Sequence, residues 1–74
     1  MDTKRIGRRI KAFRKLKGYT QTSFANEINL PIAVLGPIER GTKKPSEELL
    51  SQIADTLYIS KEELLVAGET VKED

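Results

Sequence analysis

The sequence predicts an all-α fold, a compact domain of five short helices, and three observations lead to this prediction. A chain of 74 residues has room for a single domain. Its apolar residues recur at intervals of three and four, the spacing of one face of a helix. Glycine, asparagine and proline residues separate these periodic segments at helical lengths.

The first helix is expected over residues 3–17, where one apolar stripe runs along a largely basic segment. The stripe consists of Ile6, Ile10, Phe13 and Leu16 or Lys17. Gly7 lowers the helix propensity of this segment, and the neighbouring sequence offers no reason for it. Gly18 is expected to end the helix in the left-handed conformation.

The second helix is expected to begin after Thr20, whose hydroxyl can accept a hydrogen bond from an unpartnered backbone N–H at the helix start. Its apolar face consists of Phe24, Ala25 and Ile28. Asn29 is expected to end this helix, because asparagine tolerates the left-handed conformation.

The third helix follows after a tight turn, so the two helices form a helix-turn-helix unit. Pro31 suits its first turn, where a missing N–H is no loss. Leu35 and Ile38 are expected to face the core, and Gly41 is expected to end the helix.

The fourth and fifth helices follow a polar, basic loop that ends at Pro45. Ser46 can cap the fourth helix, and Ser60 with Glu63 can form a capping box for the fifth. The buried face of the fourth helix is expected to contain Leu50, Ile53, Ala54 and Leu57. The domain is expected to span residues 1–67, and residues 68–74 form a short charged tail.

The composition excludes several classes of function. The chain has no cysteine and no histidine, which removes thiol chemistry, the usual zinc sites and the commonest general base. We therefore expect no enzyme activity, no metal and no cofactor. No apolar run reaches the roughly 18 residues of a membrane span, so the protein is expected to be soluble and cytoplasmic.

The charges are unevenly distributed along the chain. Residues 1–44 hold 11 lysines and arginines against 3 acidic residues, whereas residues 45–74 hold 2 against 8. The net charges of the two parts are therefore +8 and −6. This asymmetry predicts a basic face that attracts polyanions, although both charged surfaces could equally be ordinary solvated helix faces.

The segment from Ile6 to Gln21, followed by Phe24-Ala25 and then by Ile38-Glu-Arg-Gly41, resembles the Cro/C1-type (XRE-like) helix-turn-helix family. The similarity continues to Leu65 and covers about residues 5–66. The resemblance implies a lambda-repressor-like fold and a transcriptional regulator that binds double-stranded DNA.

The resemblance also assigns roles to individual residues. It implies that Gln21 contacts a DNA phosphate, with Thr20 and Thr22 assisting. It places further phosphate contacts at Arg40, Lys43 and Lys44. Arg14 and Glu39 are expected to form an internal ion pair that joins the first helix to the third.

The third helix departs from the chemistry of base recognition. Its outward positions are expected to be Ile32, Ala33, Gly36 and Pro37. None of these side chains carries a hydrogen-bond donor or acceptor for a base edge. Pro37 also lacks an N–H within the helix and is expected to kink or split it.

Three interpretations of this helix stay open. The protein can bind DNA mainly through phosphates, with weak base readout from thymine methyl groups against Ile32 and Ala33. Alternatively, the apolar segment Pro31–Pro37 is a patch that binds a protein partner. In the third interpretation, the helix starts late and Ile32 and Val34 turn into the core.

Members of the family bind DNA as dimers, so a homodimer is possible by analogy. The apolar residues of the fifth helix, with Tyr58 nearby, are the candidate contacts, although each could instead belong to the core. They are Leu64, Leu65 and Val66.

Overall fold

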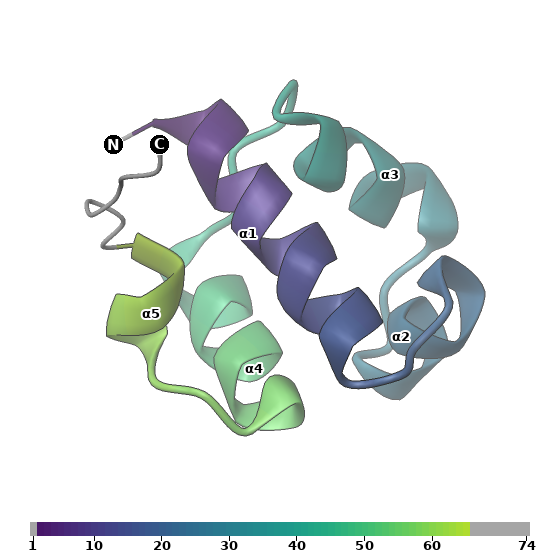
Figure 1. The fold of residues 1–74 in the computed structure, drawn as a ribbon. Coiled ribbons are helices and arrows are strands. Elements are labelled where there is room, and N and C mark those ends of the chain that lie inside the picture. Colours follow the sequence, from purple (N-terminus) through teal and green to yellow (C-terminus); the bar gives the residue numbers. More distant parts are fainter. Residues whose placement is uncertain (1, 66–74) are drawn as a thin grey trace.

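The computed structural model describes residues 2–65, in which the regular structure consists of five α-helices (Figure 1). They are α1 (Thr3–Leu16), α2 (Gln21–Glu27), α3 (Ile32–Arg40), α4 (Glu47–Leu57) and α5 (Lys61–Leu65). The predicted all-α fold of five helices is confirmed. The predicted domain end at residue 67 and the tail over residues 68–74 lie outside the described residues, so that division stays a prediction.

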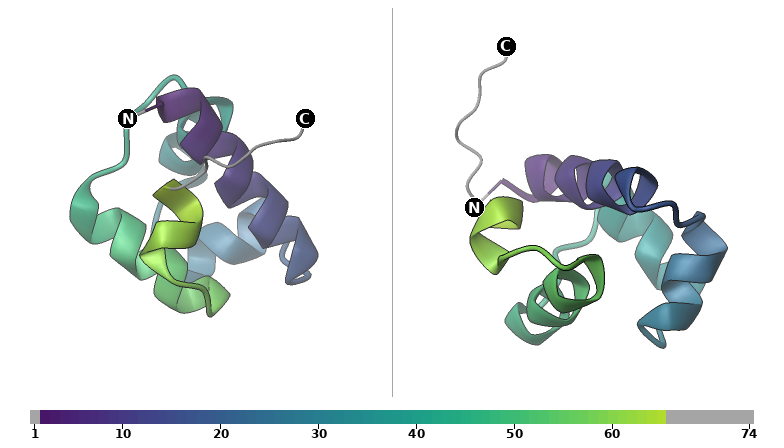
Figure 2. Two further views of the ribbon diagram at one scale, coloured as in Figure 1. Left: turned by 60° about the vertical axis from the view of Figure 1, so that its left-hand side comes forward. Right: turned by 60° about the horizontal axis from the view of Figure 1, so that its bottom comes forward.

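The other helices are arranged around α1. This helix has α3 along one side and α4 and α5 along the other, and α2 packs on α3 (Figure 1). The right-hand view of Figure 2 shows α1 lying across the remaining helices. Apolar side chains from all five helices meet in one core. The buried ones are Ile6, Ile10, Phe24, Ala25, Ile28, Leu35, Ile38, Leu50, Ile53, Ala54, Leu57 and Leu64.

Short-range capping contacts define most helix ends. The hydroxyls of Thr20 and Ser46 accept hydrogen bonds from backbone N–H groups of α2 and α4, as predicted. Ser60 and Glu63 form the predicted capping box at α5. Asp2, which sequence analysis did not identify, caps α1. Gly18 and Asn29 adopt the left-handed conformation as predicted, and so does Gly41, which was predicted to end α3.

The buried face of α1 differs from the predicted stripe. Ile6 and Ile10 are buried, but Leu16 is 74% exposed. Arg14 is buried in its place and follows Gly7 by two helical turns on the same face. Phe13 is half-buried against the core, so the stripe was wrong only at its end, where Arg14 is buried with an acidic partner on α3 and Leu16 is not.

The helix α3 passes through Pro37 without splitting, so of the predicted kink or split the split does not occur. Pro37 removes only its own bond to the Ala33 carbonyl, while the first turn closes onto the carbonyl of Pro31. Proline disfavours a helical residue before it partly through that residue's Cβ, and Gly36 has none. The buried Leu35 and Ile38 then hold the helix against the core.

An exposed ion pair joins the beginnings of α4 and α5. Lys61 Nζ donates to Glu47 Oε1 over 2.7 Å. This hydrogen bond, and then the charge of Lys61, hold the pKa of Glu47 below its ordinary value of 4.5. Because the folded pKa is lowered, the pair stabilises the fold above the unfolded pKa. That contribution is lost as the pH falls through the folded pKa.

Lys61→Ala is expected to raise the pKa of Glu47 toward its ordinary value, because it removes the two largest causes of the shift. An NMR titration of the Glu47 side chain measures this. Lys44→Ala is the matched control, since Lys44 lowers the same pKa least of the named causes. A Glu47 pKa that moves as little in Lys61→Ala as in Lys44→Ala would contradict the assignment.

Candidate nucleic-acid interface

The helices α2 and α3 form a helix-turn-helix unit whose geometry follows from the residues between them. The N–H of Leu30 donates to the carbonyl of Ala25, which closes the end of α2 over the left-handed Asn29. Pro31 precedes the first helical residue of α3 with φ −62°. Leu35 and Ile38 anchor α3 in the core, so its opposite face is directed outward.

The outward face of α3 is smaller than predicted. Ile32 is 41% exposed and Ala33 is exposed, but Pro37 is half-buried. Gly36 faces outward as predicted, but it is buried, because the guanidinium of Arg40 lies over it. The interpretation in which α3 starts late is also wrong. The helix begins at Ile32, and of the two residues expected to turn inward only Val34 packs against the core.

A buried network connects α1, α2 and α3. Arg14 Nε lies 2.6 Å from Glu39 Oε2, and Arg14 Nη2 lies 3.1 Å from Glu39 Oε1. Arg14 Nη1 also donates to the carbonyl of Tyr19 over 2.9 Å. The same Glu39 Oε1 accepts a hydrogen bond from Gln21 Nε2 over 3.1 Å. The carboxylate therefore holds both the arginine of α1 and the first side chain of α2.

The candidate phosphate-binding residues occupy different environments. Gln21 is half-buried beside Glu39, whereas Thr22, Lys43 and Lys44 are exposed. The Thr20 hydroxyl is engaged in capping, since it accepts from Ser23 N and donates to Ser23 Oγ. Lys43 and Lys44 follow α3 in the loop before α4.

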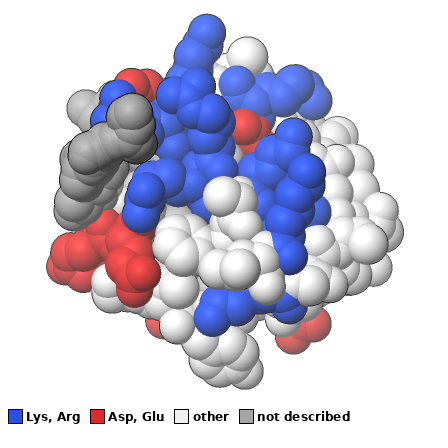
Figure 3. Space-filling view, in the orientation of Figure 1, with Lys and Arg blue, Asp and Glu red and all other residues white. Residues whose placement is uncertain are grey.

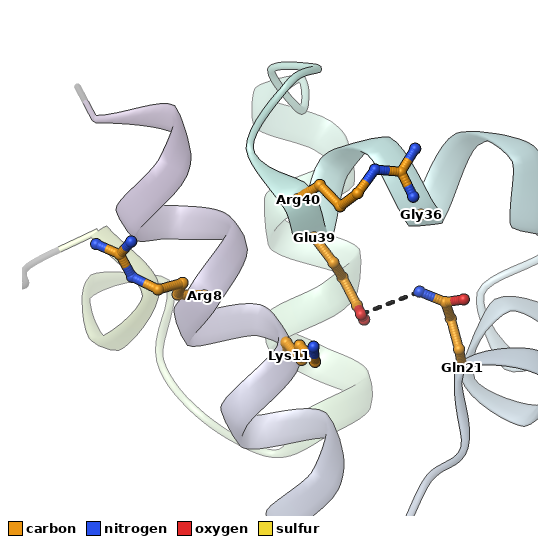
Figure 4. A pocket seen from close by; sticks show the side chains of 6 residues that line it. All are labelled: Arg8, Lys11, Gln21, Gly36, Glu39 and Arg40. Atoms are coloured by element: carbon orange, nitrogen blue, oxygen red, sulfur yellow. Dashed lines mark hydrogen bonds between the residues drawn. The ribbon is translucent and has the colours of Figure 1, made fainter.

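Sequence analysis did not identify two further basic residues at this surface, Arg8 and Lys11. They line a surface cleft of about 580 Å³ between α1, the start of α2 and the last turns of α3 (Figure 4). Its other lining residues are Gln21, Gly36, Glu39 and Arg40. The sequence did contain a signal for this basic surface. Arg8 and Lys11 are three residues apart, and residues at this spacing lie on the same face of a helix.

The surface charge follows the asymmetry of the sequence. In Figure 3, lysine and arginine side chains gather over α1 and the neighbouring part of α3, and acidic side chains gather over α5. The exposed residues of α3 include no acidic side chain, since its one glutamate, Glu39, is buried. A polyanion can therefore approach α3 and the adjacent surface of α1 without meeting an exposed carboxylate of α3.

The candidate dimer contacts are largely unavailable in the described structure. Leu64 is fully buried, so of the two alternatives left open by the sequence it belongs to the core and is not an exposed contact. Leu65 is half-buried against the same core, and Val66 lies outside the described residues. Tyr58 is 86% exposed at the end of α4.

Residues 2–65 contain neither of two other kinds of site. In this range no cluster of three or more acidic, cysteine or histidine side chains could hold a metal ion. None of the helices described there is both long enough and apolar enough to cross a membrane.

Comparison with known proteins identifies several relatives. Residues 10–64 match the family model HTH_3, helix-turn-helix. The chain is 50% identical over 64 residues to YazB, an uncharacterized HTH-type transcriptional regulator of Bacillus subtilis (strain 168), covering 86% of this chain and 93% of YazB. It is 35% identical over 69 residues to the immunity repressor protein of Bacillus phage phi105; this covers 93% of the chain but only 48% of the repressor.

A solved structure agrees with these matches. The restriction-modification controller protein C.AhdI from Aeromonas hydrophila superposes with a TM-score of 0.80 at 30% sequence identity. The superposition covers 85% of this chain and 96% of C.AhdI. The predicted lambda-repressor-like arrangement of the helices is confirmed by this similarity.

Proposed function

The chain belongs to the Cro/C1-type (HTH_3) helix-turn-helix family of DNA-binding transcriptional regulators, and we propose that it binds double-stranded DNA mainly through phosphate contacts. Members of this family are regulators rather than enzymes, which confirms the prediction that the chain is not an enzyme. The names of the two relatives described above support a regulatory role, since one is called a transcriptional regulator and the other a repressor.

The observation that carries the proposal is the position of basic and amide side chains beside the outward face of α3. Gln21 lies next to Glu39 at one side of the last turns of α3, and Lys43 and Lys44 follow its C-terminus. Such groups bind phosphate oxygens and set the register of a helix on the duplex without reading its sequence. The hydrogen bond to Glu39 fixes the Gln21 amide, so less side-chain entropy is lost when it meets a phosphate.

Few exposed side chains of α3 are able to contact the bases directly. Ile32 and Ala33 are the exposed apolar side chains that could contact a thymine methyl group. A protein partner at Pro31–Pro37 is the alternative proposal. It is less supported, because Val34, Leu35, Gly36 and Pro37 are buried or half-buried and the exposed apolar surface reduces to three residues.

Binding to random-sequence duplexes at a series of salt concentrations tests the proposal. We expect tight binding at low salt and a steep, linear fall of log K with log salt, because each neutralised phosphate contributes about −0.9 to the slope. The double variant Lys43→Ala/Lys44→Ala is expected to make that slope shallower by roughly 2. Fluorescence anisotropy of a labelled duplex measures it.

The control variant Lys17→Ala/Lys61→Ala removes the same charge from the end of α1 and from α5. It is expected to change the slope less, because neither lysine lies in the loop after α3 and Lys61 is paired with Glu47. Equal slopes for the two double variants would contradict the phosphate roles of Lys43 and Lys44. No duplex binding by the unsubstituted chain even at low salt would contradict the proposed function and favour the protein-partner alternative.

A further inference from the structure

The side chain of Arg40 does not follow the loop of Lys43 and Lys44, but lies back along α3. A Cβ atom built on Gly36 would come within 3.2 Å of Arg40 Nη1. Figure 4 shows the guanidinium directed along the helix over Gly36, toward the N-terminal end of α3. The space that a side chain at residue 36 would occupy is therefore filled by the guanidinium from one turn further on.

We propose that Arg40 is the base-reading residue of this helix, and that its guanidinium recognises a guanine in the major groove. This inference rests on the proposed function, and it assigns Arg40 a role other than the phosphate contact implied by the family resemblance. The proposed ligand is a DNA duplex with a G·C pair at one fixed position opposite α3. Two parallel N–H donors of arginine match the O6 and N7 acceptors of guanine, which is the commonest specific contact in protein–DNA complexes.

The position of Arg40 on the helix supports this role. At 100° per residue, Arg40 lies close to the direction of Ala33 and opposite the buried Leu35 and Ile38. It is thus in the middle of the outward face. Side chains of a helix tilt toward its N-terminus, and this tilt carries the guanidinium back from the last turn. The N-terminal part of a recognition helix is the part that contacts base edges.

The donors of Arg40 are available for a ligand. Among residues 2–65, no carboxylate lies within ion-pair distance of Arg40. The nearest acidic residue in sequence, Glu39, uses its two oxygens for Arg14 and Gln21. Glycine at residue 36 and the apolar Ala33 leave the guanidinium without a competing side-chain acceptor on the outward face of α3.

The chemistry of arginine allows a decisive substitution. Arg40→Lys keeps the positive charge but replaces the planar fork of donors by a point charge. A phosphate contact largely survives this change, whereas the contact with guanine loses the planar pair of donors and keeps only the less directional hydrogen bonding of a lysine. The experiment therefore selects binding sites from a random duplex pool with the unsubstituted chain, Arg40→Lys and Lys43→Ala.

We expect the unsubstituted chain to enrich a G·C pair at one position. Replacing that guanine by 7-deazaguanine, which lacks the N7 acceptor, should weaken binding roughly 10-fold. Arg40→Lys should weaken the preference and the effect of 7-deazaguanine, while its affinity for unselected duplexes stays within about 3-fold of the unsubstituted chain. Lys43→Ala should weaken binding to all sequences and keep the preference. Far-UV circular dichroism and thermal melting show that each variant is folded.

The results that would overturn the role of Arg40 differ from those that would overturn DNA binding itself. An unchanged guanine preference in Arg40→Lys overturns the inference and leaves the proposed function intact. The same is true of unselective binding by the unsubstituted chain, or of a 7-deazaguanine effect that is equal in both proteins. An absence of any duplex binding by the unsubstituted chain overturns the proposed function itself, and the inference with it.

Discussion

Gly7→Ala is expected to destabilise the domain by about 3 kcal/mol, near the upper end for overpacking of a close contact. A Cβ at this position would lie 2.3 Å from the carbonyl oxygen of Ile38 and 2.7 Å from that of Glu39. Both atoms belong to the backbone, so no side-chain rotation relieves the contact and α1 must move away from α3. The gain in helix propensity, about 1 kcal/mol, does not offset this cost. Urea denaturation measures the change.

Gly18→Ala is the control for this prediction. Gly18 has a φ of +89° but open space around its Cβ position, so alanine there costs only the left-handed conformation, about 1–2 kcal/mol. A Gly7→Ala variant that is no less stable than Gly18→Ala would show that α1 and α3 are not in close contact. An unchanged m-value in both variants would show that the same surface is exposed on unfolding.

Much of the fold could be predicted because its signals are local. A hydroxyl at a helix start acts on a backbone N–H three residues away, as at Thr20 and Ser46. A glycine or asparagine at a helix end needs no knowledge of the rest of the chain. Together with the helical spacing of apolar residues, these signals determine the number, order and approximate bounds of the helices.

Features that depend on a neighbouring helix were not predictable in this way. The neighbours of Gly7 in sequence do not reveal that backbone carbonyls of α3 approach it, although a glycine within a strong helix pattern is itself a signal of close packing. Leu16 and Leu64 are the same type of residue, yet Leu16 is exposed and Leu64 is buried. Which of them joins the core depends on how α1 and α5 each pack against the neighbouring helices.

In the candidate site, too, some features could be predicted from the sequence and others depend on neighbouring helices. The residue types needed for phosphate contact could be identified from the sequence, since charge and position in the motif suffice for that. The direction of the Arg40 side chain and the hydrogen bond from Gln21 to Glu39 could not, because each requires knowing which groups lie nearby in space. The outward positions of α3 were therefore predicted as wholly apolar, although Arg40 lies among them.

Arg14→Ala is expected to destabilise the domain by about 3–5 kcal/mol, the usual cost of removing one partner of a buried ion pair. The Arg14 and Glu39 side chains are only 7% and 3% exposed. Without the arginine, the Glu39 carboxylate stays buried with Gln21 as its remaining side-chain donor, and the Tyr19 carbonyl also loses a donor. Lys11→Ala, an exposed change on the same helix, is expected to alter stability by no more than about 0.5 kcal/mol. Equal denaturation midpoints would contradict the structural role of the pair.

A double variant separates the ion pair's contribution to stability from its effect on the DNA-binding surface. Arg14→Met with Glu39→Leu removes both charges, so no uncompensated carboxylate is left, and most of the lost stability should return. The amide of Gln21 then loses its acceptor and the restraint on its direction. We therefore expect the double variant to fold but to bind duplex DNA more weakly than the unsubstituted chain, by up to roughly 10-fold, the equivalent of one neutral hydrogen bond. Unchanged affinity in a folded double variant would show that Glu39 stabilises the helix packing without positioning Gln21.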